Sequence, residues 1–462
     1  MKTSSELDFL KQYFNSSKKT ILEDYYTFLR FQSVSSEPQY KPQLLACVDW
    51  LTDYLKNIGF HVEIWPTKGH PTIFASYIKA GSSQPTLLIY NHYDVQPVDP
   101  LELWKSPPFE PTLRNGEVYA RGAQDNKGQC FYVLLALKAL LAKDGTLPIN
   151  IKLCIDGEEE CGSAGLTQIL KEKKTSLKSD YLAVVDLSME TALKPAVTLG
   201  TRGLVTMDVE VTGTRTDLHS GSHGGIAFNP IHALIKLLAI VRNESGEITI
   251  PSFYHDVKTL SETDKAQISL IFDPNKYEAD FGAKPSGGEQ NFSALERGWI
   301  RPTFEVNGIN GGYFGEGFKT VIPAKATAKV SCRLVPDQDP KKIGRLVADF
   351  LESHAPEGTK VTVHLNAGDG KAVRANINSK GVKAFANAYE EVFNTPCDYI
   401  LAGGSIPVVT ALAEVCEGEV VMVGLGLPGD FTHAPNEHFG IDRIEKGFLS
   451  TARAIELLKN RS

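Results

Sequence analysis

The sequence predicts an α/β protein with a larger domain, built on a helix-covered and mostly parallel sheet, into which a smaller α+β domain is inserted. Three observations support this fold class. Predicted strands and helices alternate over residues 1–202, the pattern changes after Gly203, and the α/β pattern returns beyond Asn376. We therefore expect one domain formed by residues 1–202 and 376–462 and a second formed by 203–375.

The first part of the chain reads as alternating helices and strands. Apolar residues recur at helical spacing over 21–29 and 42–58, and Gly59 then favours a helix end. Further predicted helices cover 129–143 and 165–171. Short apolar runs rich in β-branched and aromatic residues predict strands at 61–65, 72–78, 86–90, 149–155 and 181–186. Strands alternating with helices indicate a parallel sheet covered by helices.

The inserted part has a different pattern. The run 206–214 alternates with period two, as an antiparallel strand with one solvated face does. A predicted helix and a polar stretch follow, and two more alternating runs flank another helix; these elements span 230–242, 243–301, 327–335, 339–353 and 360–368. We expect this domain to act as a lid or to mediate dimerisation. The helix 380–393 and the strand 419–426 return to the first domain.

Composition limits the classes of function. The 462 residues include 48 basic and 55 acidic side chains, which gives a net charge of −7. Nucleic-acid binding is not expected, because such surfaces are rich in Lys and Arg. No apolar run is long enough to span a membrane, and the first residues lack the apolar core of a signal peptide. The seven scattered cysteines favour a reducing compartment, so we expect a cytoplasmic protein.

Acidic and histidine residues follow three of the predicted strands directly. The carboxyl ends of parallel strands lie along one edge of a sheet, where α/β proteins bind ligands, so these side chains should converge. They are His92 and Asp94, the triplet Glu158, Glu159 and Glu160, and Asp186. Asp125 at a helix start and His433 in a loop after the last core strand extend the set.

Carboxylates and imidazoles without thiolates suit divalent zinc, manganese or cobalt. Two such ions carry four positive charges, which Asp125, Glu160, Asp186 and one bridging hydroxide would neutralise. Glu159 would then remain as a base. We therefore expect two divalent metals, which could be zinc, manganese or cobalt.

Each of these residues also has a structural explanation. Asp125 could cap a helix, the three glutamates could form a solvated charge run, His92 could be a core histidine, and His433 and Asp186 could be loop residues. Their joint occurrence at strand ends and at the adjoining helix start favours a functional site over separate explanations.

Nine motifs then resemble, in order, the di-zinc metallopeptidase family that includes carnosinases, other cytosolic dipeptidases, aminoacylases and carboxypeptidase G. They are NHYDVQP, ARGAQDNKG, GEEECGS, VVD, TRG, DLHSG, KTVIPAKATAKVSCRLVPDQ, GGSIPV and FTHAPNE. The resemblance implies one metal held by His92, Asp125 and Asp186. Asp125 would bridge to a second metal held by Glu160 and His433, and Asp94 would orient His92.

The family pattern E-E-x-G-S separates the roles of the adjacent glutamates. Aligned on Gly162 and Ser163, it makes Glu159 the general base and Glu160 the metal ligand. The implied reaction is metal-assisted amide hydrolysis, in which a bridging hydroxide attacks the carbonyl. Glu159 would take the water proton and pass it to the leaving amine.

The resemblance also implies substrate-binding residues in the inserted domain. His219, reaching across a dimer interface from the partner's lid, would stabilise the oxyanion, and Thr320 would cross with it. Arg333 would bind the substrate carboxylate, helped by Ser405. The alternatives are an ordinary loop histidine, an arginine on a solvated strand face and loop hydroxyls; His219 is preferred to His223 on the motif alone.

The expected protein is thus a homodimeric metallopeptidase, an exopeptidase that cleaves dipeptides or short peptides. The first alternative is an N-acyl amino acid deacylase of the same family. Asp186 favours the peptidase, because the deacylase branches tend to carry Glu there, and so does the long lid. The second alternative, a catalytically silent binding protein, would be indicated by loss of Glu159 or of a ligand, and all are present.

Overall fold

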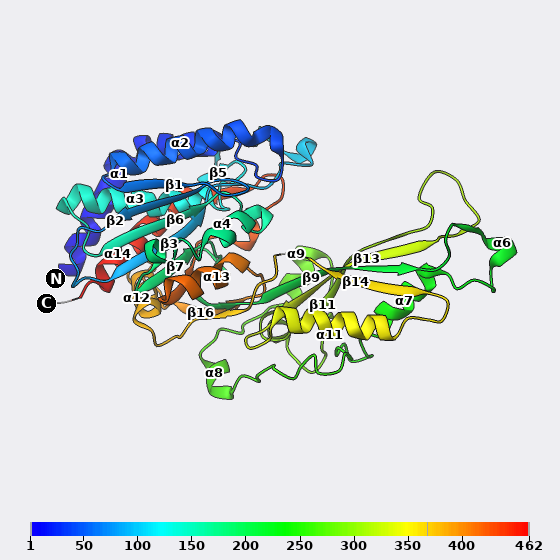
Figure 1. Ribbon diagram of the computed structural model, residues 1–462. Coiled ribbons are helices and arrows are strands. Elements are labelled where there is room, and N and C mark those ends of the chain that lie inside the picture. The colour runs from blue at the N-terminus through cyan, green and yellow to red at the C-terminus, as the bar shows by residue number, and fades with distance from the viewer. Residues whose placement is uncertain (1, 367, 461–462) are drawn as a thin grey trace. The chain divides into compact units, whose positions relative to one another are not determined.

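The computed structural model describes residues 2–366 and 368–460 and separates the chain into two compact units (Figure 1). Unit 1 comprises the chain up to Leu199, Arg374–Ile400 and the chain from Ala411 onward. Unit 2 comprises Gly200–Val373 and Leu401–Thr410. The sequence assigned residues 401–410 to the larger domain, whereas the structure packs them with unit 2.

Unit 1 is built on a mixed sheet whose centre is parallel. The strand order is β1-β2-β6-β3-β7-β17-β8, and β15 and β16 both pair with β8. Neighbouring strands in the run β6-β3-β7-β17 are parallel, while the pairs β1–β2, β2–β6 and β17–β8 are antiparallel. This confirms the predicted α/β class. The strands are β1 (His61–Trp65), β2 (Thr72–Tyr77), β3 (Thr86–His92), β6 (Asn150–Asp156), β7 (Tyr181–Val185), β8 (Ala196–Thr201), β15 (Val373–Arg374), β16 (Asp398–Ala402) and β17 (Glu419–Val423).

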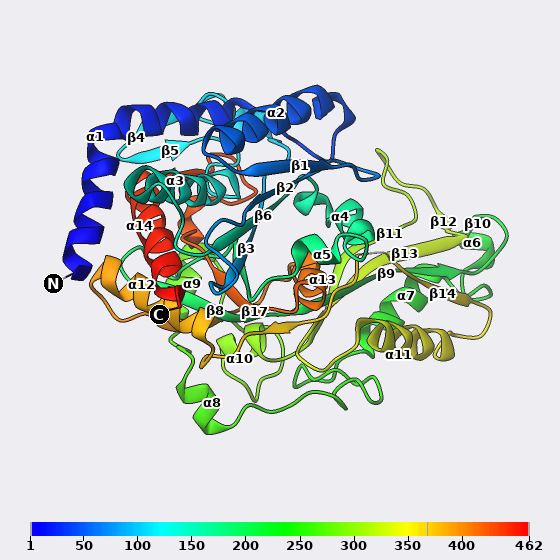
Figure 2. The same ribbon diagram turned by 60° about the vertical axis from the view of Figure 1, so that its left-hand side comes forward.

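Helices cover both faces of this sheet. Figure 2 shows α3, α12 and α14 on one side and α4 and α5 on the other. The helix α3 is buried on nearly all sides, because it packs against the sheet, α1 and α14, and it ends at Gly145, whose φ is 67°. The helices are α1 (Lys2–Arg30), α2 (Lys41–Asn57), α3 (Lys127–Asp144), α4 (Ala164–Ile169), α5 (Lys174–Leu177), α12 (Lys380–Phe393), α13 (Pro407–Cys416) and α14 (Ile441–Leu458).

The parallel strands end at the same edge of the sheet. His92 ends β3 and lies opposite Asp156, the last residue of β6, while β7 ends at Val185. A small antiparallel sheet, in the order β18-β5-β4, is separate from the large one. The loop that carries Asp125 follows β5, and the loop that carries His433 precedes β18. Its strands are β4 (Thr112–Arg114), β5 (Glu117–Tyr119) and β18 (His438–Gly440).

Unit 2 contains a four-stranded antiparallel sheet in the order β11-β13-β9-β14. Burial alternates along β9, whose inward residues Val205, Met207, Val209 and Val211 form a core with α7 and α11. Both helices lie on one face of the sheet (Figure 2). The strands are β9 (Gly203–Thr212), β10 (Leu218–His219), β11 (Thr303–Gly311), β12 (Val321–Ile322), β13 (Lys325–Leu334) and β14 (Lys360–Leu365), and the helices are α6 (Ser220–His223), α7 (Pro230–Ala239), α8 (Glu262–Ala266), α9 (Pro274–Phe281), α10 (Ala294–Trp299) and α11 (Pro340–Ser353).

Within residues 2–366 and 368–460, every helix is too short or too polar to serve as a bilayer-crossing segment.

Candidate metal centre

Asp125 lies between two histidines that are far apart in sequence. Its Oδ1 is 3.0 Å from Nε2 of His92, and its Oδ2 is 3.0 Å from Nε2 of His433. Asp125 comes just before α3, His92 ends β3, and His433 follows β17 in a loop. One carboxylate therefore faces both imidazoles, one with each oxygen.

Two further carboxylates complete two clusters. Asp186, which directly follows β7, places Oδ1 3.6 Å from Nε2 of His92, and Glu160 places Oε2 3.1 Å from Nε2 of His433. In each cluster the potential ligand atoms all lie within 4.8 Å of one another. All five residues predicted as metal ligands thus come together in unit 1, in two groups that share Asp125.

The chemistry of this set fits divalent metals. Oε1 of Glu160 is buried and has no hydrogen-bond partner among the described residues, although such atoms are almost always paired. A metal ion would satisfy it. The donors are carboxylate and imidazole, with no thiolate, which suits zinc, manganese or cobalt.

The buried carboxylate of Asp94 contacts both sides of the site. Its Oδ1 lies 3.2 Å from Nδ1 of His92, and its two oxygens accept hydrogen bonds from the backbone N–H groups of Glu159 and Glu160, each at 3.1 Å. Asp94 lies beyond the end of β3 and is fully buried. It therefore fixes the turn that carries the two glutamates as well as the ring of His92.

The charged side chains of the two clusters interact electrostatically with Glu159. Burial raises the pKa of its carboxyl well above the usual value; His92 opposes this rise, whereas Asp186 adds to it. A half-buried carboxyl with a raised pKa beside a cluster of candidate metal ligands has the character of a general base or acid.

Burial and mutual contacts raise pKa values within the two clusters. Hydrogen bonds to Asp125 and Glu160 raise the pKa of His433 to about 10. Burial, followed by the charge of Asp125, raises the pKa of Glu160 to about 7. Burial alone would lower the pKa of His92, but Asp186 and the other carboxylates raise it well above its usual value. Metal binding must displace these protons.

Metal affinity is therefore expected to rise with pH. Between pH 7 and 9 the imidazole of His433 must lose its proton, and below pH 7 so must the Glu160 carboxyl. For each proton that metal binding releases, the metal affinity rises about tenfold per pH unit. Titration calorimetry with zinc in buffers of different ionisation enthalpy counts the protons released. In His433→Gln the count should fall by about one, and a pH-independent affinity in the wild-type protein would contradict the expectation.

Glu437 is a residue of the site that sequence reasoning did not single out. Its side chain is fully buried, and its carboxylate accepts hydrogen bonds from the backbone N–H groups of Gly122, Gln124 and Asp125 at 2.9, 2.9 and 3.0 Å. Arg121 donates a fourth at 2.7 Å. The available signal was the motif FTHAPNE, which contains both His433 and Glu437. Glu437 thus fixes the loop that carries Asp125.

We expect Glu437→Gln to weaken metal binding by about 10- to 100-fold, the usual effect of losing a partner of a ligand. The two charged oxygens of the carboxylate accept four hydrogen bonds, whereas an amide has a single neutral oxygen and cannot accept all four. Competition with a chelator gives the affinity. Asp442→Asn, which makes the same chemical change at an exposed position of α14, is the control. Equal affinities in the two variants would show that Glu437 does not position Asp125.

Asn91 and Asn126 also support the cluster without having been predicted. Nδ2 of Asn126 donates to Oδ1 of Asp186 at 2.5 Å and to the carbonyl of Val185 at 2.9 Å. Nδ2 of Asn91 donates to Oδ1 of Asn126 at 2.7 Å. Together the two amides fix the carboxylate that follows β7.

In unit 2 the structure brings His219 and Thr320 together. Oγ1 of Thr320 lies 3.4 Å from Nε2 of His219, and β10 and β12 pair beside them. Nδ1 of His219 accepts a hydrogen bond from the N–H of Gly221, so Nε2 carries the proton of the neutral ring. Both side chains are exposed, so a ligand could reach this N–H in place of its long contact with Oγ1 of Thr320.

Arg333 and Ser405 lie near the start of β9. Arg333 is opposite Leu204 in the β13–β9 pairing, and Oγ of Ser405 donates to the carbonyl of Gly203 at 3.0 Å. Arg202 was not predicted. Burial, and then the charge of Arg333, lowers its pKa to about 10. Two neighbouring guanidinium groups create a positive site in unit 2.

The chain belongs to Peptidase family M20/M25/M40, whose pattern matches residues 88–457. This membership confirms the family that the motifs resemble and the prediction of a metallopeptidase. Divalent metals are the cofactors that the family implies, and the two clusters supply candidate ligands.

The chain is similar to several peptidases over most of its length. It is 31% identical to the human Beta-Ala-His dipeptidase, over 88% of this chain and 83% of that protein. It is 30% identical to the Cys-Gly metallodipeptidase DUG1 of Candida albicans, over 93% of each. Among solved structures, the M20 family metallo-carboxypeptidase Sso-CP2 of Sulfolobus solfataricus has a TM-score of 0.85 and 32% identity, and covers 95% of this chain and 99% of that one.

Proposed function

We propose that this protein is a metal-dependent dipeptidase that uses two divalent ions, with zinc the first choice. The observation that carries the proposal is the pair of clusters that share Asp125, with Glu159 beside them. Similarity to two dipeptidases over most of the chain supports the substrate class.

The residues of unit 1 have distinct roles in this proposal. His92 and Asp186 would hold one metal, Glu160 and His433 the other, and Asp125 would contribute to both. When bound, such ions polarise a carbonyl and acidify water. Glu159 takes the proton of the attacking water and delivers it to the leaving amine. Asp94 keeps the turn of Glu159 and the ring of His92 in place.

Unit 2 supplies the substrate-binding groups in this proposal. Arg333 binds the C-terminal carboxylate of the dipeptide. The neighbouring Arg202 adds positive charge, and the hydroxyl of Ser405 helps to hold the same carboxylate. The exposed N–H of His219 donates to the developing oxyanion, and Thr320 positions the ring.

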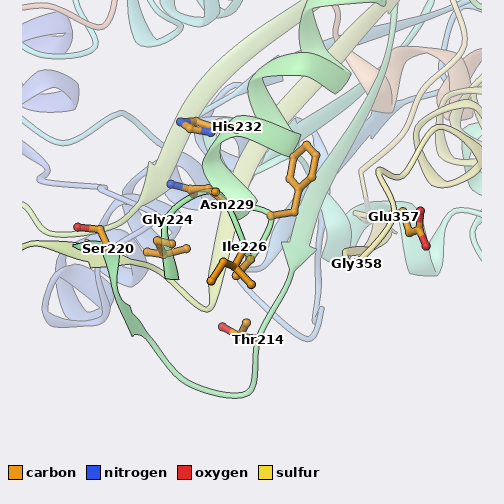
Figure 3. Close-up of a pocket in the computed structure, with 12 residues that line it drawn as sticks. Thr214, Ser220, Gly224, Ile226, Asn229, His232, Glu357 and Gly358 are labelled. Carbon is orange, nitrogen blue, oxygen red and sulfur yellow. The ribbon is translucent and has the colours of Figure 1, made fainter. Parts of the chain in front are cut away.

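We further propose that unit 2 is a dimerisation domain and that His219 acts in the site of a second copy. Unit 2 contains a cavity of about 990 Å³. Its lining residues, shown in Figure 3, include the exposed Ile226. Exposed apolar side chains also lie on α7 and on the edge strand β11, where a second copy could bury them; they include Ile235, Val306 and Ile309.

Mixed dimers test the shared site. Glu159→Gln and His219→Ala are each expected to be impaired, but a mixed dimer would contain one intact site. Co-expression should therefore restore up to about a quarter of the wild-type activity, because half of the dimers are mixed. Activity no higher than that of the separate variants would show that His219 does not act across subunits.

We also propose a cytoplasmic location. All seven cysteines are unpaired in the structure, and six are buried, which suits a reducing compartment.

The proposed function predicts that the zinc- or manganese-loaded protein hydrolyses unblocked dipeptides and that chelation abolishes this activity. A panel of dipeptides and N-acetyl amino acids, with metals measured in the same samples, tests it. Faster turnover of the N-acetyl amino acids would favour the deacylase instead. No hydrolysis of either class by a fully metal-loaded protein would favour a binding protein.

A further inference from the structure

A cavity of about 590 Å³ opens beside the metal cluster in unit 1, within the usual size of a small-molecule site. Asp125 and Asp186 contribute acidic atoms to its lining. Its apolar lining comes from a single segment that contains Leu427, Pro428, Phe431 and Ala434. The cavity therefore has a metal-binding side and an apolar side.

Phe431 is an unusual residue in this lining. Its backbone is left-handed, with φ 57° and ψ 40°, a conformation that is uncommon for a bulky residue. Its side chain remains 53% exposed, so burial in a core does not explain why a large ring occupies a strained position. Strained residues of this kind concentrate at functional sites.

The surrounding contacts fix the position of the ring. It meets the ring of His438 edge to face at 5.6 Å, and His438 stacks on Tyr119 at 4.6 Å. Thr432 bonds to Gln124 at 2.6 Å, and the N–H of Ala434 bonds to the carbonyl of Phe431 at 2.8 Å. The Phe431 ring is thus pre-positioned beside the cluster, and its exposed surface is available to a ligand.

We infer that Phe431 is a specificity-determining residue that packs against the side chain of the substrate's N-terminal residue and favours a bulky apolar side chain there. The inference rests on the proposed dipeptidase function. The carbonyl that is attacked belongs to the N-terminal residue, so the side chain of that residue lies next to the metals. In unit 1 the apolar surface beside the metal-binding acids is the lining that contains Phe431.

The test compares leucylglycine with glycylglycine, which differ in the N-terminal side chain alone. In Phe431→Ala the ratio of the two kcat/KM values should fall about tenfold, because the leucine side chain loses its apolar contact. Phe431→Tyr keeps the ring and should keep the wild-type ratio, and Phe431→Leu should give an intermediate one. Leu113→Ala removes a similarly exposed apolar side chain from β4, away from the cavity lining, and is the control.

An unchanged ratio in Phe431→Ala, or an equal loss for both dipeptides, would overturn the inference. A second measurement does not depend on turnover. Calorimetric titration of the metal-loaded proteins with L-leucine and with glycine should show leucine binding weakened about tenfold by Phe431→Ala and glycine binding unchanged. If the wild-type protein hydrolyses no dipeptide, the proposed function fails, and the leucine titration still decides the role of Phe431.

Discussion

Glu159→Gln is expected to lower kcat by about 10²- to 10⁴-fold while both metals remain bound, because an amide cannot accept the proton of the attacking water. The substitution preserves the shape of the side chain, and the backbone N–H that bonds to Asp94 is unaffected. The metal ligands are therefore expected to stay in place. Steady-state kinetics on a dipeptide, with metal content measured in the same preparation, provide the test.

Glu158→Gln is the matched control for this experiment. Glu158 lies directly before Glu159, but its carboxylate accepts a hydrogen bond from the N–H of Gly165 at 3.0 Å, which an amide oxygen can also accept. Its kcat should match the wild type. If Glu159→Gln kept the full rate with its metals bound, the proton acceptor would have to be another group.

Asp125→Asn is expected to deplete both metals, and with them nearly all activity. Asp125 belongs to both clusters, and each of its oxygens faces a different histidine. The amide keeps one neutral oxygen, so one cluster loses its ligand atom and the other exchanges a carboxylate for a weaker neutral donor. Loss of a supporting partner alone costs about 10- to 100-fold in metal affinity, so loss of a shared ligand should cost more.

Asp186→Asn separates the two metal sites. Asp186 belongs only to the cluster that contains His92, so this variant should lose about one equivalent of metal and keep the other. Equilibrium dialysis with metal analysis distinguishes the two variants. If Asp125→Asn retained two equivalents, Asp125 would not be a shared ligand.

Local patterns predicted most elements of unit 1. The strand predicted at 61–65 matches β1, in which apolar and polar residues alternate up to Trp65 and Pro66 follows. The first helix was underestimated: 21–29 was predicted, whereas α1 extends from Lys2. Its buried residues Leu10 and Phe14 are widely spaced among polar ones. That segment is stabilised by packing on α3 and α14, which a local window cannot reveal.

The candidate ligands could be predicted because parallel strands bring their carboxyl ends to one edge, where His92 ends β3 and Asp186 follows β7. Position at a strand end could not predict the roles of Glu437 and Arg202. Their importance arises from contacts with residues that are distant in sequence, such as the bond of Glu437 to the N–H of Asp125. Such contacts depend on the tertiary fold and leave no periodic signal in the sequence.

The division of the chain has a consequence for protein dissection. Because residues 401–410 belong to unit 2, the polypeptide passes between the units four times rather than twice. A fragment limited to 200–373 would lack Gly403, whose carbonyl accepts a hydrogen bond from Arg202 at 2.8 Å, and Ser405, which bonds to Gly203. Excising or transplanting unit 2 as an autonomous fragment would therefore require this ten-residue piece to be joined back by a linker or by circular permutation.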